Sequence, residues 1–210
     1  EAPEERRERE QAGEDFERQA LDLRNEARRT GHWEAVFSDA QINGWLATDL
    51  KEKFPRMLPN AVKQPRVKFE EDQARVAFRI VTPQVDSVIV VAVDMYLTDQ
   101  PNQLAVRCRS AYAGLVPVPR KKLTDIVTQA AHKPNVPVTW AQKDGDPVAL
   151  IQIPEQVEQV EGRLILENIE VRDNEVYLSG KTVKADGSGI HNNVQRVIVS
   201  QVFRSETLQR

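Results

Sequence analysis

The sequence predicts an α+β fold in which a curved antiparallel sheet of about eight strands packs around amphipathic helices. Apolar residues recur at helical spacing between residues 16 and 27 and again between residues 42 and 54, which predicts two helices. Later segments alternate between apolar and polar residues, as half-buried strands do. The short links between these segments imply that neighbouring strands are antiparallel.

Three ranges divide the chain of 210 residues. Residues 1–31 are expected to form a charged N-terminal helix or stalk, residues 32–185 a single α+β domain, and residues 186–210 a C-terminal loop and strand-like tail. The first dozen residues carry no apolar stripe and are expected to be solvated or frayed, and Thr30 and Gly31 are expected to end the helix. Two interpretations of this helix are open: a stalk leading from a membrane anchor, or a charged surface helix.

The second helix is predicted from its beginning, its stripe and its end. Ser38 and Gln41 have the spacing of a capping box, and Pro55 cannot continue a helix. Trp45 lies in the middle of the apolar stripe and is expected to pack on the sheet. The stripe consists of Ile42, Trp45, Leu46, Leu50 and Phe54.

Strands are predicted by period and turn chemistry. Residues 74–81 and 104–112 alternate, which places Ala105 and Arg107 on a solvated face. Residues 87–97 are apolar at both sets of positions, so this strand is expected to be covered on both faces or to line a cavity. Turn residues at 71–73, 82–83 and 99–102 are expected to separate neighbouring strands, and two further hairpins are expected to turn at residues 143–146 and 173–174.

Two prolines interrupt the apolar run that follows the fourth strand. Pro117 cannot donate to a strand ladder, so the strand is expected to end near it, and Pro119 suits the first position of a helix. Three cations come next: Arg120, Lys121 and Lys122. Positive charge is unfavourable at a helix N-terminus. The cations therefore either form a solvated helix start or contact anionic lipid headgroups.

No enzyme class is indicated by a local motif. The three histidines lack metal-ligand spacing, and the sequence contains no phosphate loop and no nucleophile elbow. A single cysteine, Cys108, excludes an internal disulfide. The interpretation is therefore a non-enzymatic protein without a cofactor or metal.

Nucleic acid is not an expected partner. The net charge of −3 gives no overall attraction to phosphate backbones. Arg75, Arg79, Arg107 and Arg109 could share one sheet face, but no surface aromatic residues are interleaved with them to stack on bases.

The order of segments resembles a known family. "FSDAQINGWL" on a first helix precedes a strand meander, and Gly114 to Pro119 then lead into a helix containing Leu123. Over residues 36–154 the chain resembles the YpmS-like family of bacterial extracytoplasmic proteins of unknown function. More distantly it is similar to the tubular lipid-binding (bactericidal/permeability-increasing-like) proteins. The resemblance implies a membrane-anchored, outward-facing domain with a groove for an acyl chain, and it brings no catalytic residues. The charged N-terminal helix and the Val-rich tail depart from the family.

Two functions are carried forward. The first is a membrane-anchored, extracytoplasmic domain that binds a lipid or other apolar ligand in a groove between helix and sheet. The ligand-binding residues expected for it are Ile42, Trp45, Leu46, Val88, Val90 and Ile126. Arg120, Lys121 and Lys122 are expected to face the membrane, to which a segment preceding Glu1 would anchor the chain.

The alternative is a structural or scaffolding module with a filled core and a protein partner. An unrecognised hydrolase ranks third. A continuous cavity between helix and sheet would favour the lipid ligand, whereas a solid core with an exposed apolar patch would favour the module. No oligomeric state is predicted.

Overall fold

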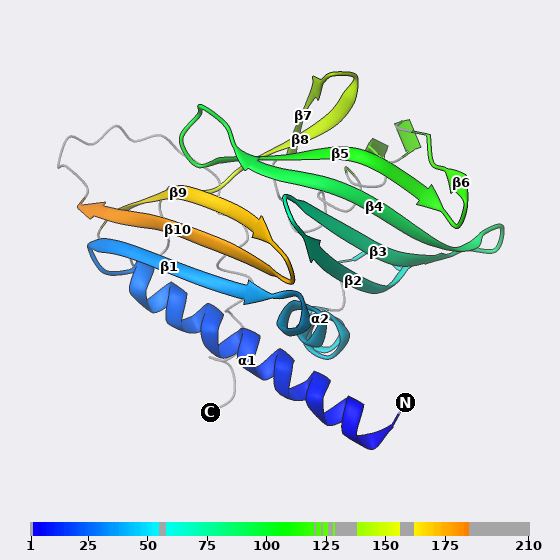
Figure 1. The fold of residues 1–210 in the computed structure, drawn as a ribbon, viewed down its shortest axis with the longest axis horizontal. Coiled ribbons are helices and arrows are strands. Elements are labelled where there is room, and N and C mark those ends of the chain that lie inside the picture. The colour runs from blue at the N-terminus through cyan, green and yellow to red at the C-terminus, as the bar shows by residue number, and fades with distance from the viewer. Residues whose placement is uncertain are drawn as a thin grey trace.

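The computed structural model describes residues 2–54, 58–119, 121–122, 124–125, 128, 138–155 and 162–184 (Figure 1). Its helices are α1 (Pro3–Ala27), α2 (Asp39–Ala47) and α3 (Asp49–Lys53). Within the described residues, no helix combines the length and the apolarity that a membrane span requires. The predicted tail, Arg120, Ile126, His132 and His191 lie outside the described residues.

The strands form two antiparallel sheets, and the predicted α+β class is confirmed. The small sheet has the order β1-β10-β9, and the large sheet the order β2-β3-β4-β5-β8-β7, with β6 paired to β5. The small-sheet strands are β1 (Gly31–Ser38), β9 (Gly162–Arg172) and β10 (Glu175–Lys184). The large-sheet strands are β2 (Val62–Glu70), β3 (Gln73–Val81), β4 (Asp86–Leu97), β5 (Gln103–Ala113), β6 (Val116–Pro117), β7 (Val138–Lys143) and β8 (Asp146–Gln152).

The predicted hairpin turns are all present, and their residues explain them. Asp72, Asn102, Asp144 and Asn174 adopt positive φ angles between 52° and 67°. Asn and Asp tolerate this left-handed conformation better than other non-glycine residues, because their short polar side chains bond locally. Each of these four residues lies between two paired strands, so turn chemistry sets where the strands end.

Helix α1 begins earlier than expected. It starts at Pro3, where a missing N–H costs nothing, and its first turns are exposed, which agrees with the expectation that these residues are solvated. Its second half packs on the small sheet: the Phe16 ring lies 5.2 Å from the Phe37 ring, and Thr182 Oγ1 donates to the Ala27 carbonyl (2.7 Å). The helix is therefore attached to the domain along this half.

Helix α2 begins with the predicted capping box. Gln41 N donates to Ser38 Oγ (3.1 Å), and Ser38 N donates to Gln41 Oε1 (2.9 Å). The expectation that Trp45 packs on the sheet is wrong. The centroids of the Trp45 and Phe16 rings are 5.6 Å apart, and Trp45 Nε1 donates to Glu17 (3.2 Å). Trp45 therefore packs against α1, because α1 crosses this face of α2.

Helices α1 and α2 cross at short distance because each has a glycine at the crossing point, Gly13 on α1 and Gly44 on α2. A Cβ on Gly44 would lie 2.5 Å from Gly13 N and 2.6 Å from the Arg9 carbonyl oxygen. No side chain fits there, so the two backbones are in contact. This contact holds α2 beside β2, where Asn43 exchanges two hydrogen bonds with the Val67 backbone (2.7 and 2.8 Å) and covers the edge of the strand.

Both sheets share one hydrophobic core, to which the small sheet contributes Phe37 and Val171, and the large sheet Phe69 and Val91. At the boundary, Asn102 from the β4–β5 turn pairs with the edge of β9. Its Nδ2 donates to the Leu164 carbonyl (2.6 Å), and its Oδ1 accepts from Leu166 N (2.7 Å). We call this contact the sheet junction. It satisfies strand-edge groups that would otherwise be left unpaired on burial.

Candidate functional site

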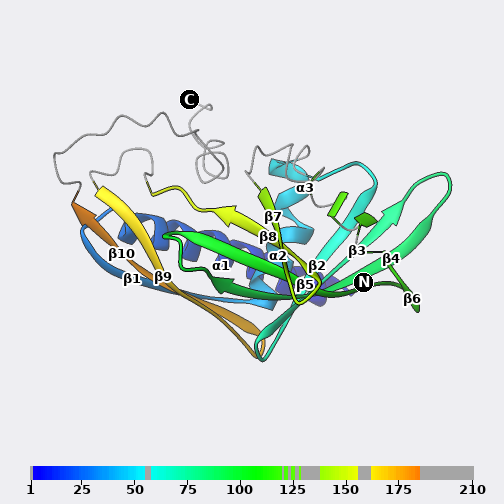
Figure 2. The same cartoon turned by 90° about the horizontal axis from the view of Figure 1, so that it is seen from above.

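Exposed apolar side chains gather at one end of the large sheet, where the β3–β4 and β5–β6 hairpins turn. This end lies opposite the small sheet, as Figures 1 and 2 show. Leu115 in the β5–β6 turn is 98% exposed and Val116 is 67% exposed. The whole set, which we call the sheet tip, is Val81, Val85, Val88, Val90, Tyr112, Leu115 and Val116.

Backbone hydrogen bonds bring the two hairpins of the sheet tip together. Gly114 N donates to the Val88 carbonyl (3.2 Å), which places the β5–β6 turn beside β4. Gly114 has a φ of 61°, a conformation that glycine adopts without a steric penalty. In the other hairpin, Thr82 N donates to the Val85 carbonyl (2.8 Å), and the Thr82 hydroxyl accepts from Val85 N (3.0 Å). These hydrogen bonds close the turns that carry Val85 and Leu115.

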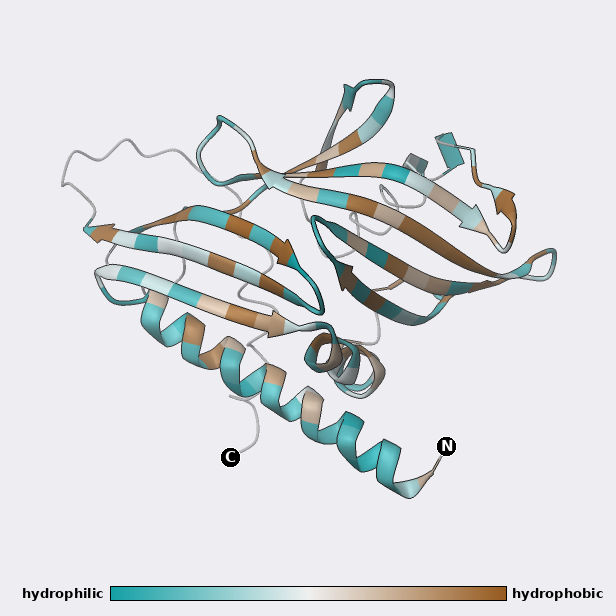
Figure 3. Ribbon diagram, viewed as in Figure 1, coloured by the Kyte–Doolittle hydropathy of each residue, from teal (hydrophilic) through white to brown (hydrophobic). Residues whose placement is uncertain are grey.

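Strand β4 has one buried face and one exposed face at the sheet tip. Ile89, Val91 and Val93 are buried in the core, whereas Val88 and Val90 are exposed. The expectation that both faces are covered is wrong for Val88 and Val90, because the shared core meets only the face of Ile89 and Val91. Figure 3 shows the resulting run of apolar residues along β4 toward this end.

At the opposite end of β5, two residues that are expected to be solvated are buried instead. Arg107, expected on a solvated face, is only 8% exposed, and Ala105 is fully buried. The Arg107 guanidinium donates to Asp146 at 2.9 and 2.7 Å and lies 3.2 Å from Asp144. The turn of residues 143–146 thus supplies carboxylates to a buried cation, which is a structural role.

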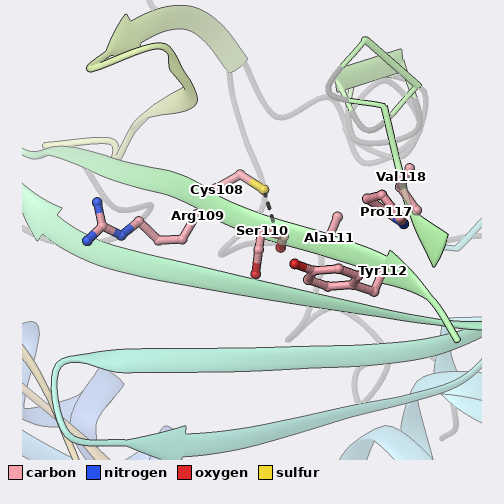
Figure 4. Close-up of a pocket in the computed structure, with 7 residues that line it drawn as sticks. All are labelled: Cys108, Arg109, Ser110, Ala111, Tyr112, Pro117 and Val118. Atoms are coloured by element: carbon pink, nitrogen blue, oxygen red, sulfur yellow. Dashed lines mark hydrogen bonds between the residues drawn. The ribbon is translucent and has the colours of Figure 1, made fainter. Parts of the chain in front are cut away.

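A small pocket lies between β5 and β6, next to the sheet tip (Figure 4). Its volume is about 190 Å³, below the range of about 300–1,000 Å³ that is typical of small-molecule sites. The Cys108 thiol faces the Ser110 carbonyl at 3.8 Å, a weak hydrogen bond that occupies the thiol. The lining residues are Cys108, Arg109, Ser110, Ala111, Tyr112, Pro117 and Val118.

The structure does not bring the six predicted ligand-binding residues together. Ile42, Trp45 and Leu46 are half-buried on α2, and Ile42 packs against the core. Val88 and Val90 lie on the face of β4 that points away from the core, and both are exposed to solvent. Ile126 lies outside the described residues.

Of the three predicted membrane-facing cations, Lys121 and Lys122 are helical and exposed, while Arg120 lies outside the described residues. Sequence reasoning missed Leu115 and Val116 as site residues. A signal was present: Gly114 and Pro117 enclose two apolar residues in a segment typical of a turn, and turns lie mostly on the protein surface.

Charge at the sheet tip is largely paired. The Arg79 guanidinium donates two hydrogen bonds to Asp86 (2.7 and 2.6 Å), which lowers the pKa of the Asp86 carboxyl. Among the described residues, no three His, Cys, Asp or Glu side chains gather as metal ligands would. Comparison with known proteins finds no matching family model, no matching curated protein and no matching solved structure.

Proposed function

We propose that this chain is a non-enzymatic domain that attaches to a membrane surface by inserting its sheet tip. The observation that carries the proposal is the gathering of seven exposed apolar side chains on two adjacent hairpins, on their turns and on the strands beside them. Single exposed apolar residues are ordinary on protein surfaces, but a contiguous set on one end of a domain marks an interaction site.

The sheet tip supports this function better than a lipid groove. Three of the expected groove residues lie on α2 and two lie on the far face of β4, so they define no common cavity. Val88 and Val90 instead contribute to the exposed set.

A bilayer also suits the chemistry of the sheet tip better than a protein partner does. Six of the seven apolar residues are aliphatic and Tyr112 is the one aromatic residue among them, whereas the aromatic residues Tyr, Trp and Phe are enriched in protein–protein interfaces. Aliphatic side chains gain free energy from the acyl region without needing a shaped counterpart, and Tyr suits the headgroup level. An extracytoplasmic location, a membrane anchor and the YpmS-like resemblance remain proposals that agree with this function.

The test is co-sedimentation with phosphatidylcholine vesicles. Leu115→Ser together with Val88→Ser removes two apolar side chains that the fold leaves in water, and we expect binding to fall about tenfold or more. The control is Ala141→Ser at an exposed position of β7, which we expect to bind as the parent does. A folded parent that binds no vesicles would reject the proposal and leave a protein partner for the sheet tip.

A further inference from the structure

We infer that the sheet tip recognises anionic bilayers, through unpaired cations that flank its apolar residues on both sides. This inference rests on the proposed membrane function and adds the class of lipid. It begins from the register of the large sheet. Lys63 is paired with Arg79, which is paired with Val88, and Arg66 is paired with Ala77, which is paired with Val90. Residues directly opposite in antiparallel strands share a face. Lys63 and Arg66 therefore lie on the same face as Val88 and Val90.

The neighbouring cations of β2 and β3 are occupied by carboxylates. Lys68 Nζ lies 2.9 Å from Asp39, and Arg75 Nε lies 2.9 Å from Glu70. Arg79 is held by Asp86, as described above. These pairs leave no charge of their own for a ligand.

Lys63 and Arg66 differ from these three cations. Both side chains are exposed, and neither forms an ion pair with any residue that the structure describes. They occupy the edge strand of the large sheet, two strands from the apolar positions of β4. Two free cations thus lie on one side of the sheet tip.

The second pair of cations follows β6 in the chain. The strand order places β2 on one flank of β4 and β5, and β6 on the other. Lys121 and Lys122 follow β6 by four and five residues, are exposed, and likewise have no ion pair within the described part of the chain. Free cations therefore lie on β2 and follow β6, the strands on the two flanks of β4 and β5, although the chain as a whole has a net charge of −3.

This arrangement matches an anionic bilayer. Apolar side chains that enter the acyl boundary bring the flanking cations to the level of the lipid phosphates. Each Lys or Arg at an anionic surface strengthens binding about fivefold, and the effect decays within a Debye length of about 10 Å at 0.1 M salt. A flat polyanion would meet the cations but leave the apolar residues in water, and a neutral bilayer would leave the cations without a counter-charge.

The experiment compares vesicles of phosphatidylcholine alone with an equimolar mixture of phosphatidylcholine and phosphatidylglycerol. We expect the parent to prefer the mixture. Lys63→Gln combined with Arg66→Gln should weaken binding to the mixture about 25-fold at low salt, with little change on phosphatidylcholine alone. The difference should shrink at high salt. Lys121→Gln combined with Lys122→Gln is a second variant with the same expectation.

The matched control is Arg163→Gln combined with Lys184→Gln, which removes the same charge from exposed positions of the small sheet and should leave binding unchanged. Equal binding of the parent to both vesicles, or equal binding of the parent and both charge variants to the mixture, would overturn the inference. The membrane function would survive that result if Leu115→Ser still weakened binding to phosphatidylcholine. Absence of binding to either vesicle would overturn both.

Discussion

The sheet junction and the sheet tip differ in what they bury: the junction buries a hydrogen-bonded polar side chain, whereas the tip leaves apolar side chains exposed. At the junction, Asn102 is nearly fully buried, and its side-chain amide forms hydrogen bonds with two backbone groups of β9. At the tip, the turns satisfy their own backbone, and Leu115 extends its apolar side chain into water. The junction is therefore complete without a partner. The apolar side chains of the tip stay exposed to water after folding, and this contrast supports the proposal that the tip is a binding surface.

The largest effect is expected at the junction. Asn102→Ala removes both hydrogen bonds to β9 and leaves a half-buried N–H and a half-buried carbonyl without this partner, at about 1–3 kcal/mol each. Alanine also tolerates the φ of 55° poorly. We expect a loss of about 3 kcal/mol in the free energy of unfolding, measured by urea denaturation.

Asn102→Gly is the matched control, because glycine removes the same amide without backbone strain. We expect it to cost about 2 kcal/mol, so that the difference between the two variants reports the strain. A glycine variant as stable as the parent would show that the amide contributes nothing, and the contrast between junction and tip would fail.

A smaller effect on the free energy of unfolding is expected on β4, where one valine lies in the core and its neighbour lies at the sheet tip. Val91 is buried, and Val91→Ala should cost about 2 kcal/mol of unfolding free energy. Val90 is exposed on the other face, and Val90→Ala should change stability by less than about 0.5 kcal/mol. Equal losses would mean that both faces of β4 are covered, as the sequence alone predicts.

The fold could be predicted from the sequence where the signal is local. The capping box of Ser38 and Gln41, the turns at Asn102 and Asn174 and the class of fold follow from neighbouring residues. The two-sheet division could not be predicted, because it depends on β1 pairing with β10, which comes much later in the chain.

The site was predictable only in part. Lys121 and Lys122 were expected to face a membrane, and that role remains a prediction, whereas Val88 and Val90 were assigned to a groove they do not line. The sequence of an apolar strand does not indicate which of its faces will be covered, since this depends on helices and strands from other parts of the chain. Arg107 shows the same limit, because its burial depends on Asp146 from another hairpin.

The most direct measurement places a probe in the β5–β6 turn. In a Cys108→Ser background, which removes the chain's single cysteine, Leu115→Cys and Lys184→Cys are each labelled with an environment-sensitive fluorophore. On equimolar phosphatidylcholine and phosphatidylglycerol vesicles, we expect the label at position 115 to shift its emission to the blue and to resist an aqueous quencher, while the label at position 184 stays in water. A label at position 115 that remains quenchable while the protein is bound to the vesicles would contradict insertion of the sheet tip.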